Sequence, residues 1–215
     1  MDIQHIEIIR NLANTRPIVW QTEINGKKVI IKDFRKNRFF FRNTVGRFLV
    51  WREERTYRKL AGIKGIPKLY GTIDGLALVI EFIAGKNLGK IKKSDKLPSS
   101  FFDFLDNTVR TIHDLGIVHC DLKKASNIIL GEDGFPYIID WAASIHKDEF
   151  DIPILKLIYE RFRIDDELAI IKHKLKYAPY LVTKRERIRY NYHSPFERFV
   201  RKMRDTILPV FQKLM

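Results

Sequence analysis

Residues 117–142 constrain the fold more than any other stretch of the chain. Two short apolar runs, 128–130 and 137–139, are separated by a segment with two glycines and a proline, which is typical of a hairpin turn. Asn127 stands directly before the first run, and Asp140 directly after the second. Because antiparallel pairing brings the start of one strand next to the end of the other, these two side chains are expected to lie together.

An amide oxygen beside a carboxylate suits a hard divalent cation such as Mg²⁺, which prefers oxygen ligands and keeps several waters. Asp121 precedes Asn127 by six positions, where its carboxylate can accept a proton from an attacking hydroxyl group. Lys123 lies between them and is a candidate contact for a transferred phosphate, with a solvated loop lysine as the alternative. The pattern indicates phosphoryl transfer, which depends mainly on positioning and charge neutralisation.

The first third of the chain predicts a sheet followed by a helix. Residues 18–24 and 29–32 are strand-like and flank an Asn-Gly pair, a strong signal for a two-residue hairpin turn. Residues 48–60 have helical spacing of apolar side chains. Residues 68–71 and 76–80 predict a second strand pair. A connector, 81–85, follows.

Lys32 ends the second strand of this predicted hairpin and can reach phosphate oxygens as a point charge. Glu53, on the predicted helix, can pair with Lys32 and hold it extended. Glu54 is the rival partner, but Glu53 shares a helix face with Tyr57 and Leu60 and is therefore favoured. Beyond the connector, helices are predicted from Ser99 to Gly116 and over residues 165–176 and 195–214, so the fold class is α+β.

Five elements of the chain occur in the order found in the protein-kinase-like superfamily. They resemble its strand lysine, helix glutamate, catalytic loop with its metal-binding asparagine, and metal-binding Asp-Phe-Gly motif: Lys32, Glu53, His119-x-Asp121, Asn127 and Asp140-Trp141-Ala142. The resemblance implies a bilobal fold that uses ATP and Mg²⁺, with a sheet-rich N-lobe over residues 1–84 and a mainly helical C-lobe over 85–215. It also implies that Glu81 and Ile83, in the connector, contact the nucleotide.

Within that superfamily the chain resembles small bacterial kinases, namely RIO-like kinases and those that phosphorylate Kdo or heptose sugars of lipopolysaccharide. Gly65-Ile66-Pro67 resembles a turn of these families, and no Ala-Pro-Glu motif follows Asp140. Three departures are evident. Residues 11–20, which should cover the phosphates, contain no glycine; the interval from Asp121 to Asn127 is one residue longer than usual; and Trp-Ala replaces Phe-Gly after Asp140.

The net charge is +14, with basic clusters at residues 35–55 and 184–204. Such a field attracts phosphorylated small molecules, anionic membrane surfaces or nucleic acid, although solvated faces give the same pattern. Residues 195–214 predict a basic amphipathic helix, which either packs on the C-lobe or lies on a membrane. The single cysteine, Cys120, indicates a reducing compartment, and no signal peptide or membrane span is evident.

The sequence therefore predicts a cytoplasmic kinase, with peripheral contact at the inner face of the cytoplasmic membrane as a further prediction. The favoured acceptor is a Kdo or heptose sugar of the lipopolysaccharide core, presented as an anionic glycolipid. A RIO-like serine/threonine kinase acting on protein is the first alternative, with nucleic acid as a less favoured partner. A pseudokinase scaffold is the second alternative, suggested by the glycine-free loop and the lengthened catalytic loop.

Overall fold

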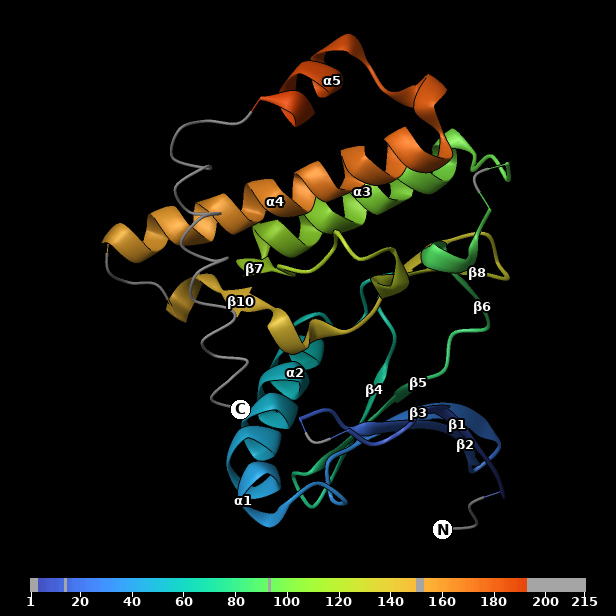
Figure 1. The fold of residues 1–215 in the computed structure, drawn as a ribbon, viewed down its shortest axis with the longest axis vertical. Coiled ribbons are helices and arrows are strands. Elements are labelled where there is room, and N and C mark those ends of the chain that lie inside the picture. Colours follow the sequence, from blue (N-terminus) through green and yellow to red (C-terminus); the bar gives the residue numbers. More distant parts are fainter. Residues whose placement is uncertain (1–3, 14, 93, 150–152, 193–215) are drawn as a thin grey trace.

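A computed structural model describes residues 4–13, 15–92, 94–149 and 153–192. The predicted C-terminal amphipathic helix at 195–214 lies outside these ranges. The fold is α+β and bilobal, as predicted: Figure 1 shows a sheet and helix α2 in one lobe, and helices α3, α4 and α5 gathered in the other. Within the described residues, no helix combines the length and apolarity needed to cross a membrane.

The N-lobe contains a five-stranded antiparallel sheet in the order β1-β2-β3-β5-β4. The predicted Asn25–Gly26 turn joins β2 to β3, and both residues adopt positive φ angles of 51° and 73°, as a tight hairpin turn requires. The first strand, β1, was not predicted. The strand bounds are β1 Gln4–Arg10, β2 Ile18–Ile24, β3 Lys27–Asp33, β4 Leu69–Ile73 and β5 Ala77–Glu81.

A long helical segment follows β3. It begins with one turn of α1 (Phe39–Phe41), passes through a π-helical turn, η1 (Arg42–Gly46), and continues as α2 (Arg47–Lys59). The predicted helix at 48–60 therefore exists, but helical structure starts nine residues earlier. In α2 the buried side chains are Val50, Glu53, Thr56 and Tyr57.

The hairpin predicted around residues 128–139 is confirmed. Strand β8 (Ile128–Gly131) pairs with β9 (Pro136–Ile138), and its other edge pairs with β6 (Gly85–Asn87). At Gly85 a Cβ atom would lie 2.2 Å from the carbonyl oxygen of Leu130, so this close approach of two backbones requires glycine.

The C-lobe is built on helices α3 and α4, which lie side by side across the upper part of Figure 1. Helix α3 matches the predicted span, whereas α4 begins twelve residues before the predicted start at 165, because its first turns are apolar apart from Lys156 and so lack the alternation of apolar and polar positions that marks a helix. The helices are α3 Ser99–Asp114, α4 Pro153–Tyr177 and α5 Lys184–Asn191, with short strands β7 Ile117–Val118 and β10 Ile145–His146. Short 3₁₀ turns are η2 Leu88–Lys90, η3 Ala125–Asn127, η4 Trp141–Ala143, η5 Lys147–Glu149 and η6 Pro179–Leu181.

One apolar core joins the two lobes. It includes Tyr57 and Leu60 from the end of α2, Leu78 from β5, Phe101 from α3 and Trp141 from the segment after β9. Burial of such side chains stabilises the fold by roughly 1.5–3 kcal/mol each. Because the core is shared, the residues that the two lobes contribute to the site are held at fixed positions relative to each other.

Candidate active site

Lys32 reaches the region between the lobes because of strand alternation. In β3, Val29 and Ile31 pack in a small cluster on one face of the sheet, whereas Ile30 packs against the main core on the other. Lys32 shares the face of Ile30, since side chains two positions apart point the same way. Its Nζ donates to Glu53 Oε1 at 2.6 Å and to Asp140 Oδ1 at 2.7 Å.

These three charges shift one another's pKa values. The Lys32 ammonium lowers the pKa of Asp140 to about 2, outweighing the effect of burial. Burial acts to lower the pKa of Lys32, but the carboxylates of Glu53 and Asp140 reverse this and raise it. Burial raises the pKa of Glu53. At neutral pH the site therefore holds a protonated lysine and an ionised Asp140.

Glu53, and not Glu54, occupies the site. Its Oε1 accepts a second hydrogen bond, 3.1 Å long, from the backbone N–H of Trp141. Glu54 instead pairs with Arg58 on the surface of α2, at 2.7 Å. Glu53 therefore ties helix α2 both to the strand lysine and to the segment that follows Asp140.

The catalytic-loop candidates Asp121 and Asn127 contact each other directly. Asn127 Nδ2 donates to the backbone oxygen of Asp121 at 3.0 Å and to its Oδ2 at 3.1 Å. Lys124 Nζ also donates to Asp121 Oδ2, at 2.6 Å. The longer interval between the two residues is thus accommodated without separating their side chains.

His119 supports this loop through hydrogen bonds from both ring nitrogens. Its Nδ1 accepts the backbone N–H of Asp121 at 3.2 Å, and its Nε2 lies 3.0 Å from the carbonyl oxygen of Ile139. The neutral ring with a proton on Nε2 satisfies both contacts. The ring also packs against the buried indole of Trp141, with 4.6 Å between centroids.

Asp166, on helix α4, was missed by the sequence reasoning. Its carboxylate accepts the backbone N–H groups of His119 at 2.7 Å and Cys120 at 3.1 Å. Asp166 is 2% exposed. Cys120, which lies between His119 and Asp121 in the loop, has a positive φ of 68°. No local pattern marks an aspartate in a helix as the anchor of a loop 46 residues away.

Asn127 and Asp140, the predicted metal ligands, lie at the same end of the β8–β9 hairpin. Ile128 pairs with Ile138, and the N–H of Ile139 donates to the carbonyl of Asn127 at 2.9 Å, so the two candidates flank one end of the hairpin. Asn127 Nδ2 is directed to Asp121, and its Oδ1 accepts one long hydrogen bond, 3.4 Å, from Ser126 Oγ. The second lone pair of Oδ1 is therefore left for a cation, together with the ionised Asp140. This donor set fits Mg²⁺.

The described residues contain no cluster of three or more His, Cys, Asp and Glu side chains suited to a metal. An ion held by Asn127 and Asp140 would therefore take its remaining ligands from water or phosphate oxygens, which is the usual situation for Mg²⁺.

Lys123 is exposed and pairs with a carboxylate of the C-lobe. Its Nζ pairs with Asp165 on α4, and Arg161 approaches the same carboxylate at 3.1 Å. The carbonyl of Lys123 also accepts from Lys172 Nζ at 2.9 Å. Its predicted contact with phosphate stays a prediction.

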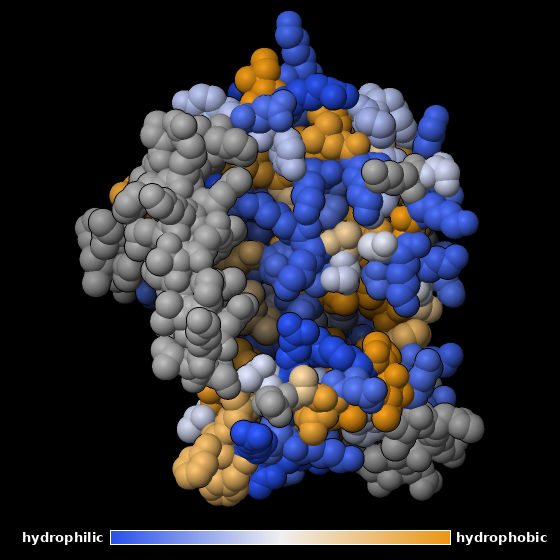
Figure 2. Space-filling view, viewed as in Figure 1, coloured by the Kyte–Doolittle hydropathy of each residue, from blue (hydrophilic) through white to orange (hydrophobic). Residues whose placement is uncertain are grey.

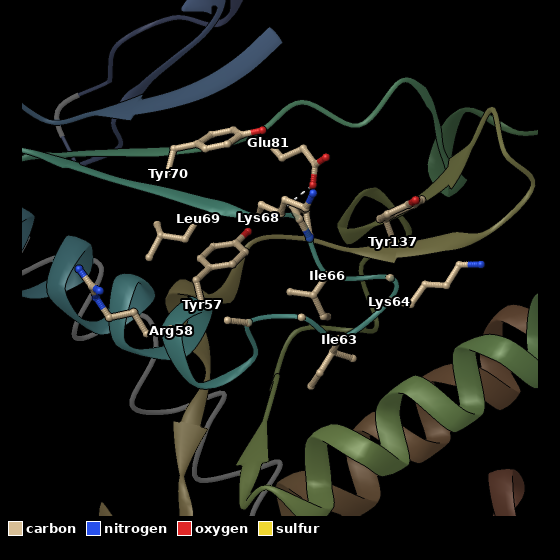
Figure 3. Close-up of a pocket in the computed structure, with 14 residues that line it drawn as sticks. Tyr57, Arg58, Ile63, Lys64, Ile66, Lys68, Leu69, Tyr70, Glu81 and Tyr137 are labelled. Carbon is tan, nitrogen blue, oxygen red and sulfur yellow. Dashed lines mark hydrogen bonds between the residues drawn. The ribbon is translucent and has the colours of Figure 1, made fainter. Parts of the chain in front are cut away.

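The connector residues lie apart from these side chains. The Glu81 carboxylate accepts the backbone N–H of Lys68 at 3.0 Å and borders a pocket of about 680 Å³ with Tyr57, Lys64 and Tyr137 (Figure 3). The predicted catalytic and metal residues do not line this pocket. The nucleotide contacts predicted for Glu81 and Ile83 stay predictions.

The glycine-free loop between β1 and β2 is pinned by Asn37, another residue that the sequence reasoning missed. The Asn37 Nδ2 donates to the carbonyls of Ala13 at 2.9 Å and Arg16 at 3.2 Å. Asn37 is 5% exposed. The loop is thus shaped by a buried side-chain amide instead of by glycine.

The sequence also matches a known protein family. The RIO domain matches residues 21–153, more than half of the chain. The chain belongs to the RIO domain family. The RIO domain match includes every predicted site residue from Lys32 to Asp140, whereas Asp166 lies beyond it.

A serine/threonine-protein kinase D from a Synechocystis species is 34% identical over 82 residues. The aligned part covers 36% of this RIO domain protein and 16% of that relative. The chain thus matches about a sixth of the length of this curated relative.

Proposed function

We propose that the protein is an ATP- and Mg²⁺-dependent kinase that transfers the γ-phosphate to a hydroxyl group. One observation carries the proposal: Lys32 pairs with both Glu53 and Asp140, which joins the sheet, helix α2 and the metal-binding hairpin at one point. Phosphoryl transfer requires this convergence, since catalysis depends on holding phosphates, metal and acceptor in register.

Each residue has a separate role in this proposal. Lys32 neutralises phosphate oxygens, and Glu53 keeps its side chain extended. Asp121 accepts the proton of the acceptor hydroxyl, with its carboxylate oriented by Asn127. Asn127 Oδ1 and Asp140 would hold Mg²⁺, which would neutralise charge on the phosphates.

For the acceptor we propose a sugar of the lipopolysaccharide inner core, Kdo or heptose. Residues 141–152 alone separate Asp140 from helix α4, whose Asp166 anchors the catalytic loop. These twelve residues are too few to form a long segment that could bind a peptide substrate. Beside Asp121, the side chain of Lys124 is 66% exposed and would attract a phosphorylated sugar.

A serine/threonine protein acceptor is the second candidate. It is favoured by membership of the RIO domain family and by the similarity to a protein named as a serine/threonine kinase. The two candidates share the same phosphoryl-transfer residues and differ in what binds next to Asp121.

The kinase proposal is tested by ATP turnover with Mg²⁺ in an Asp121→Asn variant. We expect the rate to fall about 10²–10⁴-fold because the proton acceptor is lost, with nucleotide binding retained. Asp114→Asn is the matched control, since Asp114 is exposed at the end of α3. Equal rates for the two variants would support a pseudokinase instead.

The acceptor is tested by incubating the enzyme and labelled ATP with dephosphorylated core glycolipid or with casein. Label in the glycolipid that depends on Asp121 would support the sugar proposal. Label in casein or in the enzyme itself, with none in glycolipid, would replace it with the protein-kinase alternative.

A further inference from the structure

Four aromatic rings are exposed along the α1–α2 segment. The exposed fractions are 65% for Phe39, 82% for Phe40, and 51% for both Phe48 and Trp51. Phe39 contacts Phe40, and Phe48 contacts Trp51, with ring centroids 5.8 and 5.9 Å apart. Figure 2 shows hydrophobic surface at the lower left, over the α1 end of this segment. We call these four rings the aromatic face.

Cationic side chains accompany the aromatic face. The guanidinium groups of Arg42, Arg52 and Arg55 lie over Phe39, Phe48 and Trp51, at 5.4, 5.9 and 5.7 Å from the ring centroids. Lys36 and Arg38 are also exposed next to it. No aspartate or glutamate occurs between residues 34 and 52. The α1 end of this surface is therefore both aromatic and positive, whereas at its α2 end Arg52 pairs with Glu149 and Arg55 pairs with Asp148 and Glu149.

The opposite side of the same helix is committed to the fold. Val50, Glu53 and Tyr57 are buried there, and Glu53 pairs with Lys32. The aromatic rings thus make no contribution to the main core, and exposing them to water costs free energy that a partner could recover.

We infer that the aromatic face docks on an anionic lipid surface. Aromatic side chains settle at the boundary between headgroups and acyl chains, while lysine and arginine bind lipid phosphates. The positive charge at the α1 end, where Lys36 and Arg38 are exposed, is complementary to such a surface. Because Lys32, Glu53 and Asp140 do not belong to the aromatic face, the inference does not depend on the proposed phosphoryl transfer.

Vesicle binding tests the inference. The purified full-length chain is sedimented with phosphatidylcholine vesicles that contain either 30% phosphatidylglycerol or no anionic lipid, and we expect binding to the anionic vesicles that weakens with salt. Substituting both Phe40→Ser and Trp51→Ser should lower the partition coefficient at least about tenfold. The matched control is Tyr192→Ser, because Tyr192 is an aromatic residue 67% exposed on another element.

Charge is tested separately with Lys36→Gln and Arg38→Gln. Each substitution should weaken binding to anionic vesicles about fivefold. Thermal unfolding of every variant should match the original chain, since these side chains lie outside the core.

The depth of insertion is measured by quenching of tryptophan fluorescence with brominated lipids. Trp51 should be quenched, and Trp51→Phe should lose this quenching while still binding. The quenching of Trp51 is taken as the difference between the original chain and this variant, which keeps the buried Trp141 and the partly buried Trp20. Vesicle binding without quenching of Trp51 would overturn the inference, as would binding that the Phe40/Trp51 variant leaves unchanged. The inference would also be overturned if the original chain did not bind vesicles but self-associated or bound RNA, and the Phe40/Trp51 variant lost that interaction.

Discussion

Asp166 and His119 lie 47 residues apart, yet the carboxylate of Asp166 accepts the backbone N–H of His119 at 2.7 Å. The second carboxylate oxygen accepts the N–H of Cys120 at 3.1 Å. Helix α4 thereby fixes the turn that precedes Asp121. The position of the proposed proton acceptor thus depends on a residue beyond the matched RIO domain.

Replacing Asp166 with asparagine should loosen this turn, because an amide nitrogen would face an N–H group. Loss of a hydrogen bond to a buried charged group costs about 1.5–3 kcal/mol of unfolding free energy. We expect kcat to fall about tenfold or more through misplacement of Asp121, with little change in KM for ATP. Urea unfolding and steady-state kinetics measure the two effects.

The matched control for Asp166 is Glu160→Gln, which alters an exposed carboxylate on the same helix. It should change neither stability nor kcat. If Asp166→Asn behaves like this control, the anchoring role is wrong.

The ion pair of Lys32 with Glu53 should show strong energetic coupling. Lys32→Met leaves the buried Glu53 carboxylate and the partly exposed Asp140 carboxylate without their cation, and breaking a buried pair costs about 3–5 kcal/mol. Glu53→Gln removes one of those charges. The free energy of unfolding of the Lys32→Met/Glu53→Gln double variant should therefore exceed the value expected from adding the two single effects, by about 0.5–3 kcal/mol. A double-mutant cycle of urea unfolding measures this difference.

The comparison pair is Glu54 with Arg58, on the exposed side of α2. Its coupling should be at most about 0.5 kcal/mol, as for other surface pairs at this spacing. Similar coupling energies for the two pairs would contradict the distinct role assigned to Glu53.

Stability should decline as the pH falls from about 6.5 to 4. Burial lowers the pKa of His146 from 6.5 to about 4, so between these values the unfolded chain binds a proton that the folded chain does not. The loss should be about 2 kcal/mol. Asp140, whose pKa Lys32 lowers to about 2, adds a further loss between pH 4 and 2, as its carboxylate becomes protonated.

His146→Gln should flatten most of the slope between pH 6.5 and 4, measured as the urea midpoint at each pH. Part of the slope should persist, because burial also lowers the pKa of His173. An unchanged slope in His146→Gln would show that other groups control acid stability.

Trp141 should act as a packing residue and tolerate phenylalanine. It is fully buried against His119, and its contact to Glu53 uses the backbone N–H, which any residue retains. Trp141→Phe should cost about 1–2 kcal/mol and Trp141→Ala about 3–5 kcal/mol. Thermal unfolding measures both, and nucleotide binding should survive in the phenylalanine variant. A loss of binding there would point to a role for the indole itself.

Elements with short-range signals were predictable from the sequence. The Asn25–Gly26 turn and the hairpin ending at Asp140 are specified by turn residues next to apolar runs, and both occur as expected. Lys32 and Glu53 could be paired in advance because strand and helix periodicity set the side on which each lies. The predicted start of α4 was wrong by twelve residues, since its first turns are almost entirely apolar and show no helical alternation of apolar and polar positions.

By itself the sequence determined the α+β fold class, the order of the motifs and the candidates Lys32, Glu53, Asp121, Asn127 and Asp140. Tertiary structure alone decided that Asp166 holds the catalytic loop, that Asn37 shapes the loop after β1, and that the rings of the aromatic face stay outside the core. The physical reason is that these outcomes depend on contacts between residues far apart in the chain. Local periodicity reports which residues share a face, but burial and hydrogen-bond partners arise only when the elements pack together.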